Sequence, residues 1–159
     1  MTQTEDLEQL LYAVAQGRLS PENALANLQS FTYKTLDNFA KIDHHRALRT
    51  GFAEAIWGPG KTPQQILGII EVMQPDNPCV IATRIEPAVF EQLQQQMPSL
   101  HYFAQARICA TTPLPLSPWH PGQIGIVSAG TSDQAVVEEA AIAATLWGFA
   151  VQRFADVGV

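Results

Sequence analysis

The feature that most constrains the fold is a proline-rich segment, TTPLPLSPWHPG, at residues 111–122. Proline lacks a backbone N–H and cannot lie inside a helix or a central strand, so the four prolines of this segment exclude regular structure from it. A domain boundary is therefore predicted inside the segment. The whole chain has 159 residues, which suits one domain or a small domain followed by part of another.

The chain before this segment alternates between strand-like and helix-like patterns. Helices are predicted to begin at Pro63, capped by Thr62, and at Pro87, because proline favours the first helical position. The apolar runs typical of strands lie at 52–57, 79–83 and 102–110. Strands alternating with helices predict an α/β unit.

Two short helices are predicted before this unit. Leucines and a valine recur at helical spacing between Leu7 and Val14, and Ser20-Pro21 begins the second helix. Residues 1–36 are too few to form their own core, so we expect an appendage or a docking element.

The chain after the proline-rich segment predicts one βαβ crossover. A strand at 123–127 is followed by an alanine-rich helix, closed by Gly148, and by a strand at 149–154. The side chains expected to face inward are Val137, Ala140, Ala141 and Ala144. A parallel strand pair needs cover on both faces. We therefore expect either a truncated domain or a unit that docks on the preceding segment or on another chain.

Composition excludes several classes of protein. The formal net charge of −6 disfavours nucleic-acid binding, which needs a basic surface. No apolar run reaches the ~20 residues that span a bilayer, and the acidic start MTQTEDLEQL is no signal peptide. The only cysteines, Cys79 and Cys109, do not make a disulfide framework or a cysteine-based zinc site. A reduced, cytoplasmic compartment is expected.

The polar turn at 128–133 is the first candidate site. It joins the carboxyl end of a strand to a helix N-terminus, where free N–H groups and the helix dipole favour an anion. Its binding residues would be Gly130, Thr131 and Ser132. Asp133 and Asp156 would supply carboxylates at the same sheet edge, where ligands bind in open α/β sheets. An equal alternative is that these side chains only cap the helix.

A second candidate site is a cluster of cations in an otherwise acidic chain. Arg46 and Arg49 would share one helical face and, with Lys61, suit a phosphate or a carboxylate. The alternative is ordinary surface charge. No metal site is expected at Asp43-His44-His45, because adjacent histidines rarely reach one ion.

Together these motifs resemble the LarB family of nickel-pincer cofactor biosynthesis, whose cyanobacterial members are called circadian phase modifier, CpmA. The resemblance rests on DHHRALRTGFAE at 43–54, Gly58-x-Gly60-Lys61-Thr62, Ala82-Thr83-Arg84, Ser128-Ala-Gly-Thr-Ser-Asp133, Val137-x-Glu139-Ala140 and Asp156-Val-Gly-Val159. It implies a small α/β domain at 37–115, a linker at 116–122 and, at 123–159, the start of a doubly wound PurE-like parallel sheet. In PurE-like carboxylases the Ser-Asp turn binds a ribonucleotide and carbon dioxide. Gly130 and Thr131 depart from the PurE pattern and favour LarB.

The resemblance implies a reaction. LarB enzymes carboxylate the pyridinium ring of nicotinic acid adenine dinucleotide with carbon dioxide or bicarbonate, hydrolyse its phosphoanhydride and release AMP, with magnesium implicated. Asp133 and Asp156 would be catalytic, and Gly130, Thr131, Ser132, Arg46, Arg49 and Lys61 would bind substrate. A homo-oligomer is also implied. The family's nucleophilic cysteine falls beyond Val159, so the chain by itself is expected to be inactive.

Two other functions remain open at this stage. One is a PurE-like aminoimidazole ribonucleotide carboxylase or mutase of purine biosynthesis, which the long first domain disfavours. The other is a non-catalytic, nucleotide-binding regulator of the CpmA type. Binding of a nucleotide without turnover would favour the second alternative.

Overall fold

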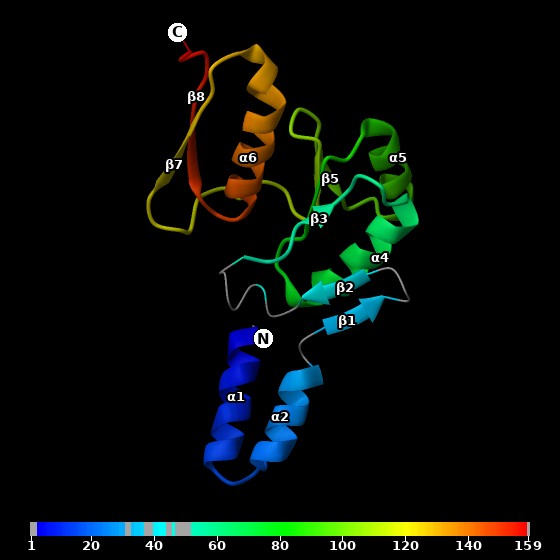
Figure 1. The fold of residues 1–159 in the computed structure, drawn as a ribbon, viewed down its shortest axis with the longest axis vertical. Helices are drawn as coiled ribbons and strands as arrows, with labels where there is room; N and C mark the ends of the chain where they lie inside the picture. The colour runs from blue at the N-terminus through cyan, green and yellow to red at the C-terminus, as the bar shows by residue number, and fades with distance from the viewer. Residues whose placement is uncertain (1–2, 31–32, 37–39, 44–45, 47–51, 159) are drawn as a thin grey trace.

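The structure is a computed structural model that describes residues 3–30, 33–36, 40–43, 46 and 52–158 (Figure 1). The helices and strands in chain order are α1 (Gln3–Ala15), α2 (Pro21–Ser30), β1 (Tyr33–Leu36), β2 (Ala40–Asp43), β3 (Ile56–Trp57), α4 (Pro63–Met73), η1 (Gln74–Asp76), β4 (Ile81–Thr83), α5 (Pro87–Gln96), β5 (His101–Phe103), β6 (Ile108–Ala110), β7 (Gln123–Val127), η2 (Thr131–Asp133), α6 (Gln134–Leu146) and β8 (Ala150–Phe154). The α/β class expected from the sequence is confirmed.

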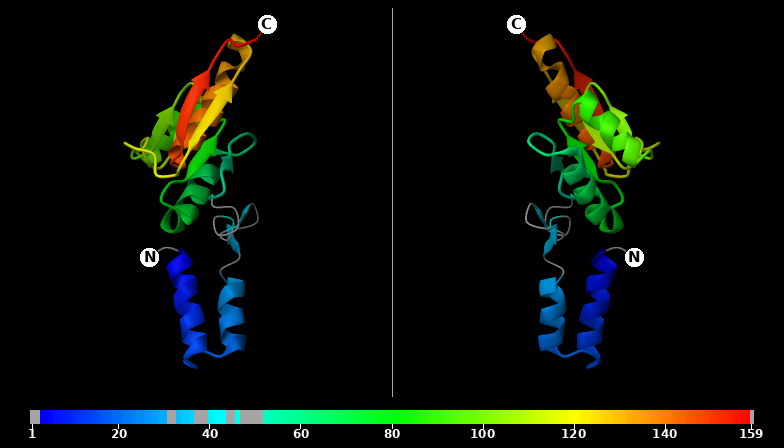
Figure 2. Two further views of the ribbon diagram at one scale, coloured as in Figure 1. Left: turned by 90° about the vertical axis from the view of Figure 1, so that its left-hand side faces the viewer. Right: turned by 90° about the vertical axis from the view of Figure 1, so that its right-hand side faces the viewer.

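The two N-terminal helices form a helical hairpin that projects from the rest of the molecule (Figure 2). Gly17, at φ 68°, turns the chain between them. Ser20 then caps α2, because its Oγ accepts the N–H of Asn23 at 3.2 Å. Strands β1 and β2 follow as an antiparallel pair in which Tyr33 lies opposite Asp43.

A mixed sheet of four strands, in the order β3-β4-β6-β5, is the centre of the molecule. Only β3 and β4 are parallel, and α4 makes the crossover between them. The expected strand at 52–57 is regular only at Ile56–Trp57. The single strand expected over 102–110 is wrong. The chain reverses between β5 and β6, where Arg107 takes a left-handed φ of 49° and donates its N–H to the Ala104 carbonyl.

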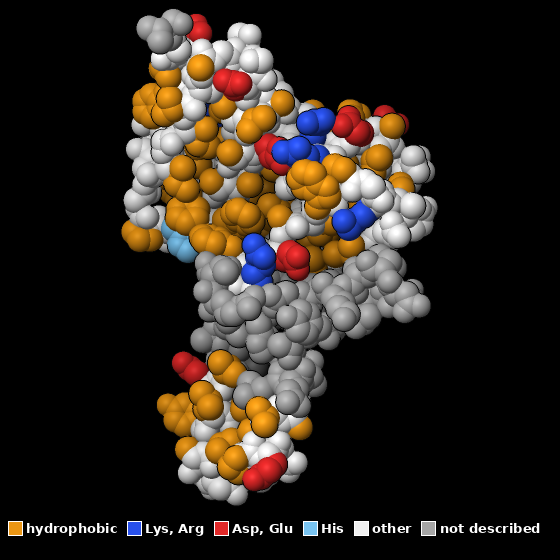
Figure 3. Space-filling model, viewed as in Figure 1, with side chains coloured by type: hydrophobic (Ala, Val, Ile, Leu, Met, Phe, Trp, Pro, Cys, Tyr) orange, Lys and Arg blue, Asp and Glu red, His pale blue; other side chains and the backbone are white. Residues whose placement is uncertain are grey.

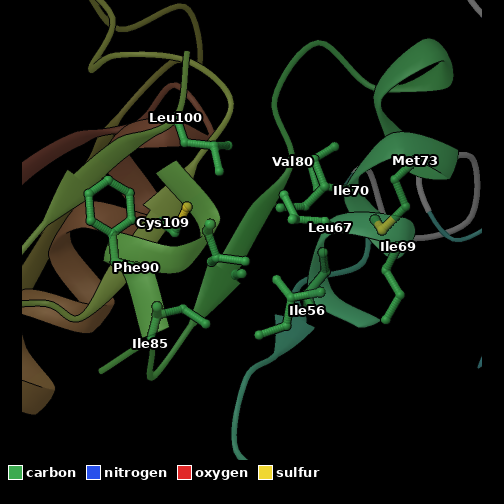
Figure 4. Packing of buried hydrophobic residues seen from close by; sticks show 13 residues of the cluster. Ile56, Leu67, Ile69, Ile70, Met73, Val80, Ile85, Phe90, Leu100 and Cys109 are labelled. Carbon is green, nitrogen blue, oxygen red and sulfur yellow. The ribbon is translucent and has the colours of Figure 1, made fainter. Parts of the chain in front are cut away.

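The residues of this sheet alternate between two cores, as the two-residue period of a strand requires. Ala82 and Cys109 face α4 and α5, where they join the larger cluster drawn in Figure 4. Their neighbours Ile81 and Ile108 belong to a second cluster on the opposite face. Helix α4 buries Ile66, Leu67, Ile69, Ile70 and Met73.

The second cluster is closed by α6. Ile142 and Leu146 of this helix pack with Ile81 and Ile108 of the central sheet. The opposite side of α6 contacts the parallel pair β7–β8. The helix therefore lies between two sheets (Figure 1), and the βαβ unit docks on the preceding segment, one of the arrangements that the sequence left open. Ala140, expected to face inward, is exposed, because the larger Ile142 and Leu146 face the central sheet instead.

The proline-rich segment is fastened to the end of α6. The N–H groups of Trp119 and His120 both donate to the carbonyl of Gly148, at 2.9 and 3.0 Å. The His120 ring stacks on Phe149 with centroids 4.6 Å apart. Gly148 has φ 86°, and the Trp119 ring fills the space that a Cβ would occupy, so glycine is required at this position.

Candidate functional site

The first candidate site lies at the carboxyl edge of the β7–β8 pair. Val127 is in register with Phe154, so both strands end at this edge. The loops that follow are joined by a hydrogen bond from the Val157 N–H to the Ser128 carbonyl, at 3.2 Å. A Cβ on Gly158 would lie 2.8 Å from the Ala129 carbonyl oxygen, so glycine permits this close approach. The 128–133 turn and the loop of Asp156 are thus held together.

Within the turn, Asp133 is engaged with Gly130. The Gly130 N–H donates to the Asp133 carboxylate at 3.3 Å, and the Asp133 N–H donates to the Gly130 carbonyl at 3.2 Å. The Asp133 carboxylate therefore caps the short helix η2 (Thr131–Asp133), whereas it makes no side-chain cap hydrogen bond to α6. Thr131 and Ser132 are exposed, and as the first residues of the helical segment they have no intrahelical acceptor for their N–H groups. These two residues keep the donors that an anion needs.

Asp156 lies in the adjoining loop. It is exposed and takes a left-handed φ of 57°, a conformation that aspartate tolerates better than most residues. The structure thus brings Asp156, Asp133 and the turn residues Gly130, Thr131 and Ser132 to one edge, as the spacing predicted. Their roles in catalysis or binding stay predictions.

The cations of the second candidate site are only partly within the described residues. Lys61 follows β3 at the central sheet, and its Nζ donates to the Trp57 carbonyl at 2.8 Å. Arg46 is exposed. Arg49, His44 and His45 fall outside the described residues. A shared helical face for Arg46 and Arg49 therefore stays a prediction.

Neither thiol of the chain is suited to act as a nucleophile. Burial raises the pKa of Cys109 from 9.0 to about 12, and the residue has no exposed surface. Burial also raises the pKa of Cys79, against the opposing effect of hydrogen bonds from Thr112. A thiolate, not a thiol, attacks carbon, so the raised pKa of each group disfavours its reactive form near neutral pH.

No group of three or more His, Cys, Asp or Glu side chains that could hold a metal ion occurs in the described part of the chain. Magnesium usually binds through one or two carboxylates together with substrate phosphates. Asp133 and Asp156 could supply such carboxylates, but they do not form a cage on their own. No helix within the described ranges is long and apolar enough to cross a membrane.

One grouping was missed by sequence reasoning. Arg84, after β4, pairs with Glu139 of α6 and lies against the Trp57 ring. The motif Ala82-Thr83-Arg84 was a signal, but its spacing did not assign a role. The left-handed backbone of Arg84, at φ 56°, and the partner 55 residues away become evident only in three dimensions.

These features define an α/β protein in which a small mixed-sheet domain docks on a parallel βαβ unit. The chain belongs to the family of the LarB/PurE-like N-terminal domain, whose family model matches residues 33–113. It is also similar to an uncharacterized protein, MJ0165, of Methanocaldococcus jannaschii, at 27% identity over 162 residues. This alignment covers 98% of the chain and 62% of the relative, so the chain spans less than two thirds of the relative's length.

Proposed function

We propose that this chain is the substrate-binding N-terminal part of a LarB-type carboxylase and hydrolase that acts on nicotinic acid adenine dinucleotide with carbon dioxide or bicarbonate. The observation that carries the proposal is the meeting of the 128–133 turn with the Asp156 loop at one carboxyl edge. The family membership supports the enzyme class. A location in the cytoplasm and assembly as a homo-oligomer belong to the same proposal.

In this proposal the turn holds a phosphate of the substrate. The N–H groups of Thr131 and Ser132 and their hydroxyls donate to the phosphate, and the dipole of α6 adds positive potential. Asp156 and Asp133 act as general acid and base, accepting and donating protons while the ring is carboxylated. In the same proposal Arg46, Arg49 and Lys61 bind substrate from the first domain, where Lys61 lies after β3. Magnesium would be bound through the substrate's phosphates, because the described residues alone form no cage for the ion.

Because both thiols of the chain are protonated and at least partly buried, we expect the 159-residue chain to bind the dinucleotide without turning it over. Isothermal titration with nicotinic acid adenine dinucleotide tests the binding. A turnover assay with bicarbonate tests the absence of product.

A charge placed in the turn makes the binding test specific. No atom lies within 4 Å of a Cβ built on Gly130, so Gly130→Asp and its neutral control Gly130→Asn both fit. Gly130→Asp is expected to weaken binding at least about tenfold, because its carboxylate repels the phosphate, while Gly130→Asn binds as the parent chain does. Equal affinities for the two variants, or no binding by the parent chain, would contradict the proposal.

A further inference from the structure

The α1–α2 hairpin carries apolar side chains that its own two helices leave uncovered. Of residues 7–27, whose side chains the structure describes, only Ala24 is buried. Leu11 and Leu25 are each 57% exposed, and Tyr12 is 65% exposed. Figure 3 shows apolar side chains over both helices on the face of the hairpin that is turned to the viewer. The hairpin therefore presents an apolar surface without a core of its own.

The two cores of the molecule do not include the hairpin. Figure 2 shows it projecting away from the sheets, and no described residue of α1 or α2 belongs to either core cluster. Helices of 13 and 10 residues are marginal in water by themselves, and units below about 40 residues usually need a disulfide, a metal or a partner chain. Residues 3–30 contain no cysteine, and the described residues hold no metal cluster, which leaves a partner chain.

Leu11 and Leu25 lie at one level of the hairpin. Leu11 is four residues before the end of α1, Leu25 is four residues after the start of α2, and the two helices run in opposite directions (Figure 1). Each leucine follows a more buried residue, Leu10 or Ala24, by one position, which is a rotation of about 100°. In an antiparallel pair the same rotation turns both leucines toward one broad side of the hairpin, which we call the leucine face.

The charges of the hairpin limit what can cover the leucine face. The open end of the hairpin carries Glu5, Asp6 and Glu8, whereas the turn end carries Arg18 and Glu22 and is neutral. Two copies packed in the same direction would gather six carboxylates at one end, three from each copy. Two copies packed in opposite directions place each acidic end beside a neutral turn end, so a second copy fits in the antiparallel arrangement.

The position of Leu11 suits this antiparallel arrangement. Glu5 lies six residues before Leu11, and Arg18 lies seven residues after it. With Leu11 on a two-fold axis, Arg18 of one copy reaches the level of Glu5 of the partner subunit, so opposite charges flank the leucine contact. A two-fold axis also lets one apolar face cover itself, without a second kind of surface. Two antiparallel hairpins packed face to face form a four-helix bundle.

The simpler interpretation is a solvent-exposed appendage, since single exposed leucines are common on protein surfaces. That interpretation does not explain two leucines at one level of a unit that lacks a core. We propose that the α1–α2 hairpin is a dimerisation element, whose leucine face packs antiparallel against the leucine face of a second copy. The contact does not depend on the reaction proposed above.

Sedimentation equilibrium of the 159-residue chain over a concentration series tests the contact. The parent chain is expected to dimerise with a Kd below about 100 µM, and Leu11→Glu combined with Leu25→Glu to dimerise at least about tenfold more weakly. Gln9→Glu combined with Asn23→Glu is the matched control, because it adds the same charge at two exposed positions on the opposite side of the hairpin. A monomeric parent chain, an unchanged Kd in the leucine variant or an equal loss in the control would overturn the proposal.

Cysteine cross-linking tests the arrangement without adding charge to the leucine face. In a Cys79→Ser background, where the remaining Cys109 is buried, Leu11→Cys is expected to form a disulfide-linked dimer under mild oxidation. Arg18→Cys is not expected to do so, because antiparallel packing holds the two turn ends at opposite ends of the bundle. No cross-link at Leu11→Cys, or equal cross-linking at Arg18→Cys, would overturn the proposal. A dimer that persists in the leucine variant would overturn this contact and leave the homo-oligomer proposed above standing, so the two proposals can fail separately.

Discussion

At the scale of single residues, the Cys109 thiol shows how the fold controls chemistry. Strand β6 places it between α4 and α5 on one side and its own sheet on the other, with no exposed surface. The cost of burying a thiolate raises its pKa to about 12. The same burial that makes Cys109 a core residue removes it as a nucleophile.

The raised pKa predicts a loss of stability at alkaline pH. The unfolded thiol releases its proton near pH 9.0, whereas the folded thiol holds it until about 12. The stabilising contribution is therefore fully present below pH 9.0 and decreases as the pH rises toward 12. Urea unfolding at a series of pH values measures it. Cys109→Ala should show a flatter decline than the parent chain above pH 9.0, and identical slopes would contradict the account.

At the scale of elements, α4 is stabilised by a reciprocal cap. The Thr62 hydroxyl accepts the Gln65 N–H at 3.2 Å, and the Gln65 side chain accepts the Thr62 N–H at 2.9 Å. Pro63 occupies the first helical position. The helix therefore begins immediately after the glycine-rich loop that carries Lys61, so its start also fixes where that loop ends.

Thr62→Ala is expected to lower the free energy of unfolding by about 1 kcal/mol, because the Gln65 N–H loses its acceptor. Gln64→Ala, in the exposed first turn of the same helix, should change it by less than about 0.5 kcal/mol. Urea denaturation followed by circular dichroism compares the two. If both variants lose the same free energy, the cap contributes nothing beyond helix propensity.

At the scale of the whole molecule, α6 joins the two sheets into one structure. Leu146 is 2% exposed and packs with residues of the central sheet, while its helix covers β7 and β8. The proline-rich segment adds a second connection at Gly148. The two sheets are therefore expected to unfold together.

Leu146→Ala is expected to lower the free energy of unfolding by about 2–5 kcal/mol, because apolar burial is lost and a cavity is left behind. Val136 of the same helix is 63% exposed, so Val136→Ala should lower the free energy of unfolding far less. Circular dichroism and tryptophan fluorescence should report one coincident transition for the parent chain and a single shifted transition for Leu146→Ala. Two separate transitions, of which only one shifts, would show that the sheets fold independently.

Much of the fold could be predicted because its signals are local. The cap at Thr62, the prolines that begin α4 and α5, and the βαβ order after residue 122 act within a few residues of chain. The meeting of the 128–133 turn with Asp156 also follows from topology, since parallel strands end at the same edge. The roles of these residues remain predictions.

The sequence by itself determined the helix starts, the strand alternation and the α/β class, because capping, proline geometry and side-chain period are properties of neighbouring residues. Tertiary structure decided the reversal at Arg107, the buried face of α6 and the contact of Arg84 with Trp57 and Glu139. Each of these depends on a partner far along the chain. An alanine-rich helix has several comparable faces, and only the central sheet selects the one that carries Ile142 and Leu146.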